Sequence, residues 1–151
     1  MMDINLTTPF LMTKEVLPLM RKNKFGRIIN ISSTHGLIAS ANKSAYTASK
    51  HGIVGLTKVT ALETAKENIT CNSVCPGFVL TELIQDQIDF IAKKKKISNQ
   101  KAEVELLKEK QPSLQFVQKK DVASLIYYLS SEGASQITGS NIPIDGAWTS
   151  Q

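Results

Sequence analysis

Hydrophobic positions along the chain alternate between helical and strand-like spacing. Over about residues 4–20 the apolar side chains recur at the spacing of a helix, which Pro18 is expected to kink or end. Short apolar runs at 27–31 and 69–75 are rich in β-branched residues and predict two buried strands. A third and shorter strand is expected over 141–145.

Helices are predicted between and after these strands. A long amphipathic helix is expected over about 45–66, with Ser44 as its cap, and another begins after Thr81, a second candidate cap. The stretch 92–120 is polar and poorly periodic in its first part, and 121–130 predicts a further helix. Strands separated by helical crossovers favour a parallel sheet wrapped by helices. The fold class is therefore α/β, with about three strands in one domain.

The composition of the 151 residues, 42% hydrophobic and 21% charged, is typical of a globular protein and excludes disordered and fibrous classes. The net charge is +5, and much of the excess lies in Lys93 to Lys96. No aromatic platform accompanies these lysines, so a solvated face is expected and nucleic-acid binding is not.

No apolar run approaches the ~20 residues that span a bilayer, and the first residues do not form a secretory signal, so a cytoplasmic location is expected. The two cysteines, Cys71 and Cys75, cannot build a disulfide framework. Their spacing along a strand is too long to chelate one metal readily, so we expect buried inert thiols and no metal site.

Tyr46 and Lys50 are the candidate catalytic pair. Four residues apart on a helix, they share one face, and an ammonium group one turn away favours the phenolate electrostatically. Such a phenol can exchange a proton with an alcohol or carbonyl oxygen. Ser33 follows the first strand, where open α/β sheets bind ligands, and its hydroxyl can hold the same oxygen. The Tyr–Lys spacing alone is far more often that of a surface pair on an amphipathic helix.

Five segments, in the same order along the chain, resemble the short-chain dehydrogenase/reductase family. They are Asn5-Leu6, Gly26 to Ser33, Tyr46-Thr47-Ala48-Ser49-Lys50, Asn72 to Gly77 and Ile142 to Gly146. The resemblance covers nearly the whole chain and implies the C-terminal part of a doubly wound Rossmann-type sheet. It also implies that residues 1–151 form one partial domain, with a mobile substrate lid at about 82–118.

The resemblance implies a role for each motif residue. Tyr46 would act as the general acid/base, and Lys50 would bind the ribose of the nicotinamide cofactor. Ser33 would orient the substrate oxygen, and Asn5 would support a chain of waters that relays protons through Lys50. The cofactor is taken by resemblance to be NAD, and the residues expected to contact it, besides Tyr46 and Lys50, are Pro76, Gly77, Val79 and Thr81.

Within the family, the likeness is greatest to members that act on a small 3-hydroxy acid. It implies hydride transfer between NAD(H) and 3-hydroxybutyrate or acetoacetate. Besides Ser33, His35, Lys43 and Gln87 would bind the substrate carboxylate, and Trp148 would pack near its methyl end. Taken singly, the histidine can satisfy backbone groups, the lysine can be solvated and the tryptophan can be core. A reductase for another small hydroxy acid or a 3-oxoacyl substrate stays open.

The sequence contains neither the glycine-rich motif nor the acidic residue that bind the adenosine part of a dinucleotide. By resemblance, the first mononucleotide-binding half is expected to be absent, which would leave the first strand with an unpaired edge. Two hypotheses follow. The chain is the C-terminal part of an oxidoreductase completed by that half, or it is an inactive remnant that at most oligomerises. Relatives assemble, usually as tetramers, through helices matching 4–20 and 45–66; no membrane or nucleic-acid partner is expected.

Overall fold

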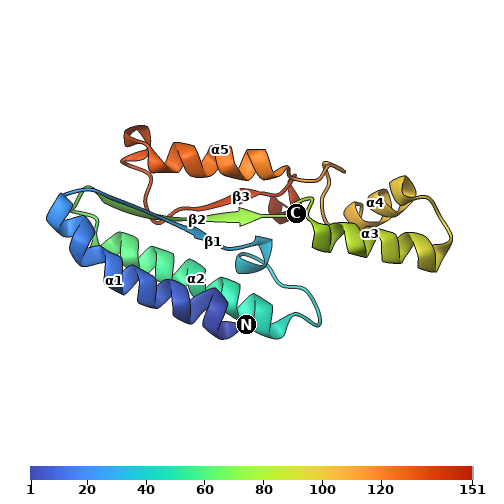
Figure 1. Cartoon of the computed structure of the whole chain (residues 1–151), viewed down its shortest axis with the longest axis horizontal. Coiled ribbons are helices and arrows are strands. Elements are labelled where there is room, and N and C mark those ends of the chain that lie inside the picture. Colours follow the sequence, from blue (N-terminus) through green and yellow to red (C-terminus); the bar gives the residue numbers. More distant parts are fainter. Residues whose placement is uncertain (151) are drawn as a thin grey trace.

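The computed structural model describes residues 1–150 and has three layers, with a parallel sheet between helices. The helices are α1 (Thr8–Asn23), α2 (Ser44–Glu63), α3 (Glu82–Lys95), α4 (Asn99–Leu107) and α5 (Lys119–Ser130), and the strands are β1 (Gly26–Ile31), β2 (Ile69–Pro76) and β3 (Asn141–Ile144). Helices α1 and α2 cover one face of the sheet and α5 covers the other, while α3 and α4 extend beyond its end (Figure 1).

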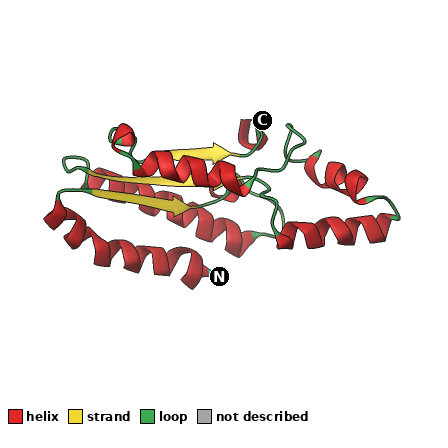
Figure 2. Ribbon diagram, turned by 45° about the horizontal axis from the view of Figure 1, so that its top comes forward, coloured by secondary structure: helices red, strands yellow, loops and turns green. Residues whose placement is uncertain are grey.

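The three strands are parallel in the order β1-β2-β3, as the alternation of strands and helices predicts. Ile29 lies opposite Asn72, and Val74 lies opposite Ile142. The central strand β2 is buried along nearly its whole length, because helices cover it on both faces. All three strands point toward the end where α3 and the C-terminus lie (Figure 2), so residues that follow each strand gather there.

Apolar side chains form a separate cluster on each face of the sheet. Between the sheet and the α1–α2 layer, Ile28, Cys71 and Ala61 pack together. On the α5 side the cluster centres on Val74 and Leu129, both fully buried. The α3–α4 pair has its own small core, so it is packed internally rather than against the sheet.

The structure contradicts two expectations about the first helices, that α1 ends near Pro18 and that Ser44 caps α2. Helix α1 does not end near Pro18 but continues to Asn23, because Pro18 lies on the exposed face, where water can satisfy the carbonyl that loses its partner. Ser44 is not the cap of α2. It is already the first helical residue, Lys43 occupies the N-cap position, and no side chain caps this end. Thr81 does occupy the N-cap position of α3 but makes no side-chain capping hydrogen bond.

The polar stretch 92–120 contains more helix than its pattern suggests. Helix α4 begins after Ser98, whose hydroxyl accepts a hydrogen bond from the backbone N–H of Lys101 at 3.4 Å. Helix α5 begins at Lys119, two residues before the predicted start, because Gln118 and Asp121 form a capping box. Local capping chemistry therefore fixes both boundaries where the hydrophobic periodicity is weak.

Cys71 and Cys75 are fully buried free thiols, as predicted. Burial raises the pKa of Cys71 to about 11, which keeps this thiol protonated and unreactive. Among residues 1–150, no helix is long and apolar enough to cross a membrane.

Candidate active site

Tyr46 and Lys50 lie on the same side of α2, close to the carboxyl end of β1. Lys50 Nζ is 5.8 Å from the centroid of the Tyr46 ring and donates a hydrogen bond to the backbone carbonyl of Ile31 at 2.9 Å. This bond ties the ammonium group to the end of the strand. Burial lowers the pKa of Lys50 from its ordinary value.

Ser33 lies where the chain leaves β1. Its backbone is extended, and its Oγ accepts a hydrogen bond from the backbone N–H of His35 at 3.1 Å. Because this contact uses a lone pair of the oxygen, the hydroxyl hydrogen stays available to donate to a ligand. The neighbouring Ser32 donates to the carbonyl of Lys50 at 3.1 Å and so joins this loop to α2.

His35 lies at the centre of an aromatic cluster. Its ring contacts Tyr46 and Trp148 edge-on, with 5.7 Å between centroids in each case, and Phe78 packs on Trp148 at 4.9 Å. Only 3% of His35 is exposed, and its Nε2 has no hydrogen-bond partner within residues 1–150. Burial lowers the pKa of His35 from 6.5, and the positive charges of Lys43 and other neighbours lower it further.

Trp148 is placed by a tight turn after β3. The buried carboxylate of Asp145 accepts hydrogen bonds from the backbone N–H groups of Ala147 at 3.1 Å and Thr149 at 2.9 Å. It also accepts from the hydroxyl of Thr149 at 2.7 Å. Gly146 has a φ of +58°, and a Cβ there would overlap Ser113, so the turn needs glycine at this position. The turn directs the indole into the site.

The loop after β2 is held by residues distant in sequence. The backbone N–H of Gly77 donates to the carbonyl of Ile144 at 3.0 Å, and that of Phe78 donates to Oε1 of Gln111 at 2.9 Å. Gln111 is fully buried, and a Cβ on Gly77 would lie 2.6 Å from its Oε1. Sequence reasoning missed Gln111, because a lone glutamine in a polar stretch carries no signal of burial.

These elements surround a cavity of about 660 Å³ at the carboxyl end of the sheet. Nine of the twelve residues predicted from the sequence line it: Ser33, His35, Lys43, Tyr46, Gly77, Val79, Thr81, Gln87 and Trp148. Asn5 and Lys50 instead line a second cavity of about 430 Å³ beside β1, and Pro76 lines neither. The amide of Asn5 donates to Ser49 Oγ at 3.2 Å, which places it one residue from Lys50.

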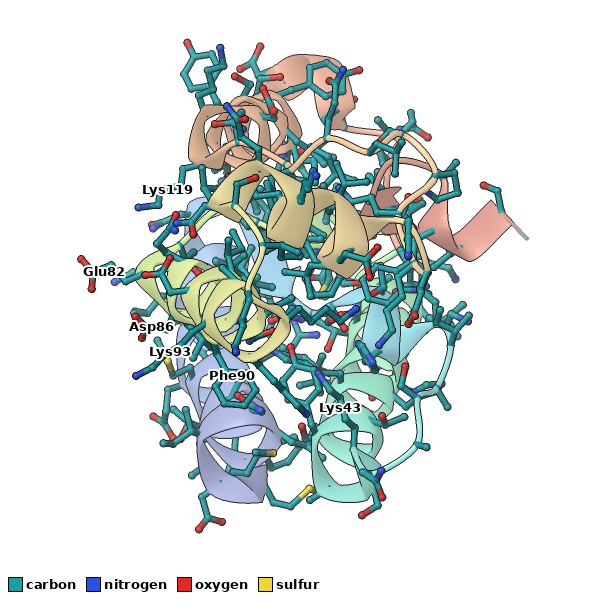
Figure 3. All side chains as sticks on the ribbon, turned by 90° about the vertical axis from the view of Figure 1, so that its right-hand side faces the viewer. Lys43, Glu82, Asp86, Phe90, Lys93 and Lys119 are labelled. Atoms are coloured by element: carbon teal, nitrogen blue, oxygen red, sulfur yellow. The ribbon has the colours of Figure 1, made fainter. Side chains whose placement is uncertain are left out.

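The larger cavity is suited to an anion. Lys43 enters from the start of α2 and Gln87 from α3, and no carboxylate is among the described residues that line the cavity. In Figure 3, which views the α3–α4 end, Asp86 and Lys93 project from α3 outward. The cavity can therefore supply a cation, an amide and an imidazole to one small acid, next to a phenol and a hydroxyl.

Comparison with known proteins gives a consistent assignment. A family model of short-chain dehydrogenases, described as "Enoyl-(Acyl carrier protein) reductase", matches residues 1–149. The D-beta-hydroxybutyrate dehydrogenase of Cupriavidus necator is 53% identical over 148 residues, which cover 98% of this chain and 57% of that protein. The chain thus spans little more than half the length of this relative.

Solved structures show the same fold. A 4-hydroxyisoleucine dehydrogenase complexed with NADH superimposes with a TM-score of 0.86 at 38% identity, covering 99% of this chain and 58% of that one. An actinorhodin polyketide ketoreductase with NADPH gives a TM-score of 0.86 at 35% identity, covering 97% and 57% respectively. The α/β arrangement is therefore the Rossmann-type fold of these enzymes.

Proposed function

The chain belongs to the short-chain dehydrogenase/reductase family of oxidoreductases, and from that premise we propose that it interconverts 3-hydroxybutyrate and acetoacetate with NAD(H). The observation that carries the proposal is one cavity in which Tyr46 and Ser33 lie beside Lys43, His35 and Gln87. No carboxylate is among the described residues that line it. The same substrate is named for the Cupriavidus relative.

The substrate carboxylate would be bound by three side chains from three segments. Lys43 supplies a charge, Gln87 an amide N–H, and His35 the buried ring nitrogen that lacks a partner within residues 1–150. Trp148 and Phe78, in contact at 4.9 Å, would close the space around the methyl group. Such a wall would limit the length of the carbon chain beyond the reacting carbon, which would favour a four-carbon acid.

Tyr46 would donate a proton to the carbonyl oxygen in reduction and accept it from the alcohol in oxidation. Ser33 can donate a hydrogen bond to the same oxygen, since its own oxygen already accepts from His35. The ammonium of Lys50 lies 5.8 Å from the centroid of the Tyr46 ring, so its positive charge would act beside the reacting group. Asn5 and Lys50 line the same second cavity, through which waters would replace the proton from solvent.

The residues present fit a nicotinamide cofactor. Thr81 lines the cavity with a hydroxyl not used for helix capping, and Gly77 and Val79 expose backbone and a small apolar surface beside it. Lys50 would hold the ribose, and Pro76 would fix the end of β2 below the loop. When bound, the cofactor supplies or accepts the hydride at C3 of the substrate. The helices within 82–118 would act as the lid over this site.

Self-association is a second proposed property. Both α1 and α2 carry exposed apolar side chains: Phe10, Leu11, Leu19, Val59 and Leu62. Exposed apolar groups gathered on adjacent helices are typical of subunit interfaces. We therefore expect a homo-oligomer formed through α1 and α2, which is also the one property that an inactive remnant would keep.

The test is turnover of acetoacetate and NADH by the chain, alone and together with a segment that carries the glycine-rich motif. Tyr46→Phe should lower the rate by about 10²–10⁴-fold and leave NADH binding intact, because the ring stays in place. Tyr128→Phe, on the exposed side of α5, is the matched control and should keep full rate. Undiminished turnover by the Tyr46 variant would refute the acid/base assignment, and oligomers without turnover under either condition would favour the remnant.

A further inference from the structure

Two lysines flank the row of rings that forms one wall of the larger cavity. Lys43 Nζ lies 5.9 Å from the centroid of the Tyr46 ring, and Lys110 Nζ lies 5.5 Å from that of Trp148. His35 contacts both rings edge-on, so an unbroken series of contacts joins the two lysines. Lys43 lines the cavity itself, whereas Lys110 contacts the ring of Trp148, which lines the cavity.

Lys110 is held beside Trp148 by the contacts of its own segment. Its backbone N–H donates to the carbonyl of Leu107 at 2.9 Å, at the end of α4. The next residue, Gln111, is fully buried and accepts a hydrogen bond from the backbone N–H of Phe78, in the loop that lines the cavity. The point from which Lys110 projects is therefore fixed relative to the cavity wall.

The segment that carries Lys110 holds the excess positive charge of the chain. Residues 93–120 contain nine of the 18 basic residues and only three of the 13 acidic ones. Lys95 and Lys108 are paired with Glu105, but within residues 1–150 no carboxylate lies within salt-bridge distance of Lys110. Its charge is thus not neutralised by a neighbour and can act on the cavity.

We infer that Lys110 is a specificity-determining residue, whose ammonium group beside Trp148 favours small oxo or hydroxy acids over neutral analogues in this cavity. The inference rests on the proposed function, since it concerns the same carboxylate. Two cations would then act on the cavity. Lys43 supplies one from the start of α2, and Lys110, in the segment after α4, supplies the other beside Trp148. Lys110 is not among the residues that line the cavity, so its effect on a bound acid is electrostatic.

The electrostatics of His35 support this placement. After burial, the charges of Lys43 and Lys110 are the largest causes that lower the pKa of His35, followed by that of His51. Tyr46 also faces the imidazole. A charge that disfavours a proton on His35 equally favours an anion beside it.

The experiment compares Lys110→Met with Lys110→Arg, and uses Lys101→Met, an exposed lysine on α4, as a control with the same loss of charge. Trp148 is the single tryptophan of the chain and lines the cavity, so its fluorescence reports binding without turnover. The ligands are acetoacetate and its neutral analogue 4-hydroxybutan-2-one. In addition, NMR follows the titration of His35 without ligand.

We expect Lys110→Met to weaken acetoacetate binding about three- to ten-fold at low salt and to leave the neutral ketone unaffected. The difference should shrink at about 0.5 M salt. Lys110→Arg and Lys101→Met should bind like the parent. Only Lys110→Met should raise the pKa of His35.

Two results would overturn the inference while leaving the proposed substrate intact. In one, Lys110→Met weakens binding of the neutral ketone as much as that of acetoacetate. In the other, Lys110→Met changes neither the affinity for acetoacetate nor the pKa of His35. A parent chain that binds neither ligand would instead contradict the proposed function. In that case the titration of His35 still decides whether the charge of Lys110 reaches the cavity, because it needs no ligand.

Discussion

Replacing Asp145 by asparagine should unfold the turn that places Trp148. The carboxylate is 6% exposed and accepts three hydrogen bonds, from the N–H groups of Ala147 and Thr149 and from the hydroxyl of Thr149. Asparagine keeps one acceptor oxygen, and its NH₂ must face at least one of these donors. Losing one charge-assisted bond and weakening the other two costs about 2–4 kcal/mol, a large part of the stability of a small domain.

Urea unfolding followed by circular dichroism measures this loss in the free energy of unfolding, and acrylamide quenching measures the exposure of Trp148. Asp86→Asn is the control, because Asp86 lies exposed on α3 and its carboxylate makes no hydrogen bond within residues 1–150. It should change neither quantity. If Asp145→Asn costs less than about 0.5 kcal/mol and leaves Trp148 equally protected, the reasoning about the turn is wrong.

Three further outcomes are expected. Gly55→Ala should stabilise the chain by about 1 kcal/mol in urea unfolding, since a Cβ there meets nothing within 4 Å and alanine favours helix. Gly36→Ala should destabilise it by about 1–3 kcal/mol, because its Cβ would lie 2.8 Å from the carbonyl oxygen of Lys50. Acetoacetate binding, followed by Trp148 fluorescence, should stay constant as the pH falls to 6.5, the ordinary pKa of histidine, and strengthen only at lower pH. Burial lowers the pKa of His35, so its imidazole gains a positive charge only there, and His35→Gln should abolish the increase.

The sheet could be predicted from the sequence because its signals are local. The runs at 27–31 and 69–75 match β1 and β2 to within one residue at each end, since their β-branched residues favour strands. Much of the cavity could also be predicted, because Ser33 and Tyr46 follow from motif and spacing. His35, Lys43 and Gln87 came only through the family resemblance.

The remaining parts depend on contacts that no local pattern encodes. Helix α4 lies in a lysine-rich stretch with few apolar residues, and Ala102 becomes buried only when it packs against Ile84, Ile88 and Ala92 of α3. Gln111 is polar in sequence yet fully buried, because the loop at Phe78 supplies its partner. Lys110 lies near the cavity only because its ammonium group contacts the ring of Trp148, 38 positions away in the sequence. Such a contact is visible only in the folded chain.

Hydrogen bonds within the described chain hold part of the wall of the larger cavity. Gly77 is bound to the end of β3 and Phe78 to Gln111, so the loop after β2, which lines the cavity, is held by internal hydrogen bonds. A wall fixed in this way is preorganised, and its affinity for a small acid does not require the energy of bound cofactor to assemble it. Substrate binding and hydride transfer should therefore be separable: acetoacetate should alter Trp148 fluorescence under conditions in which no NADH is oxidised.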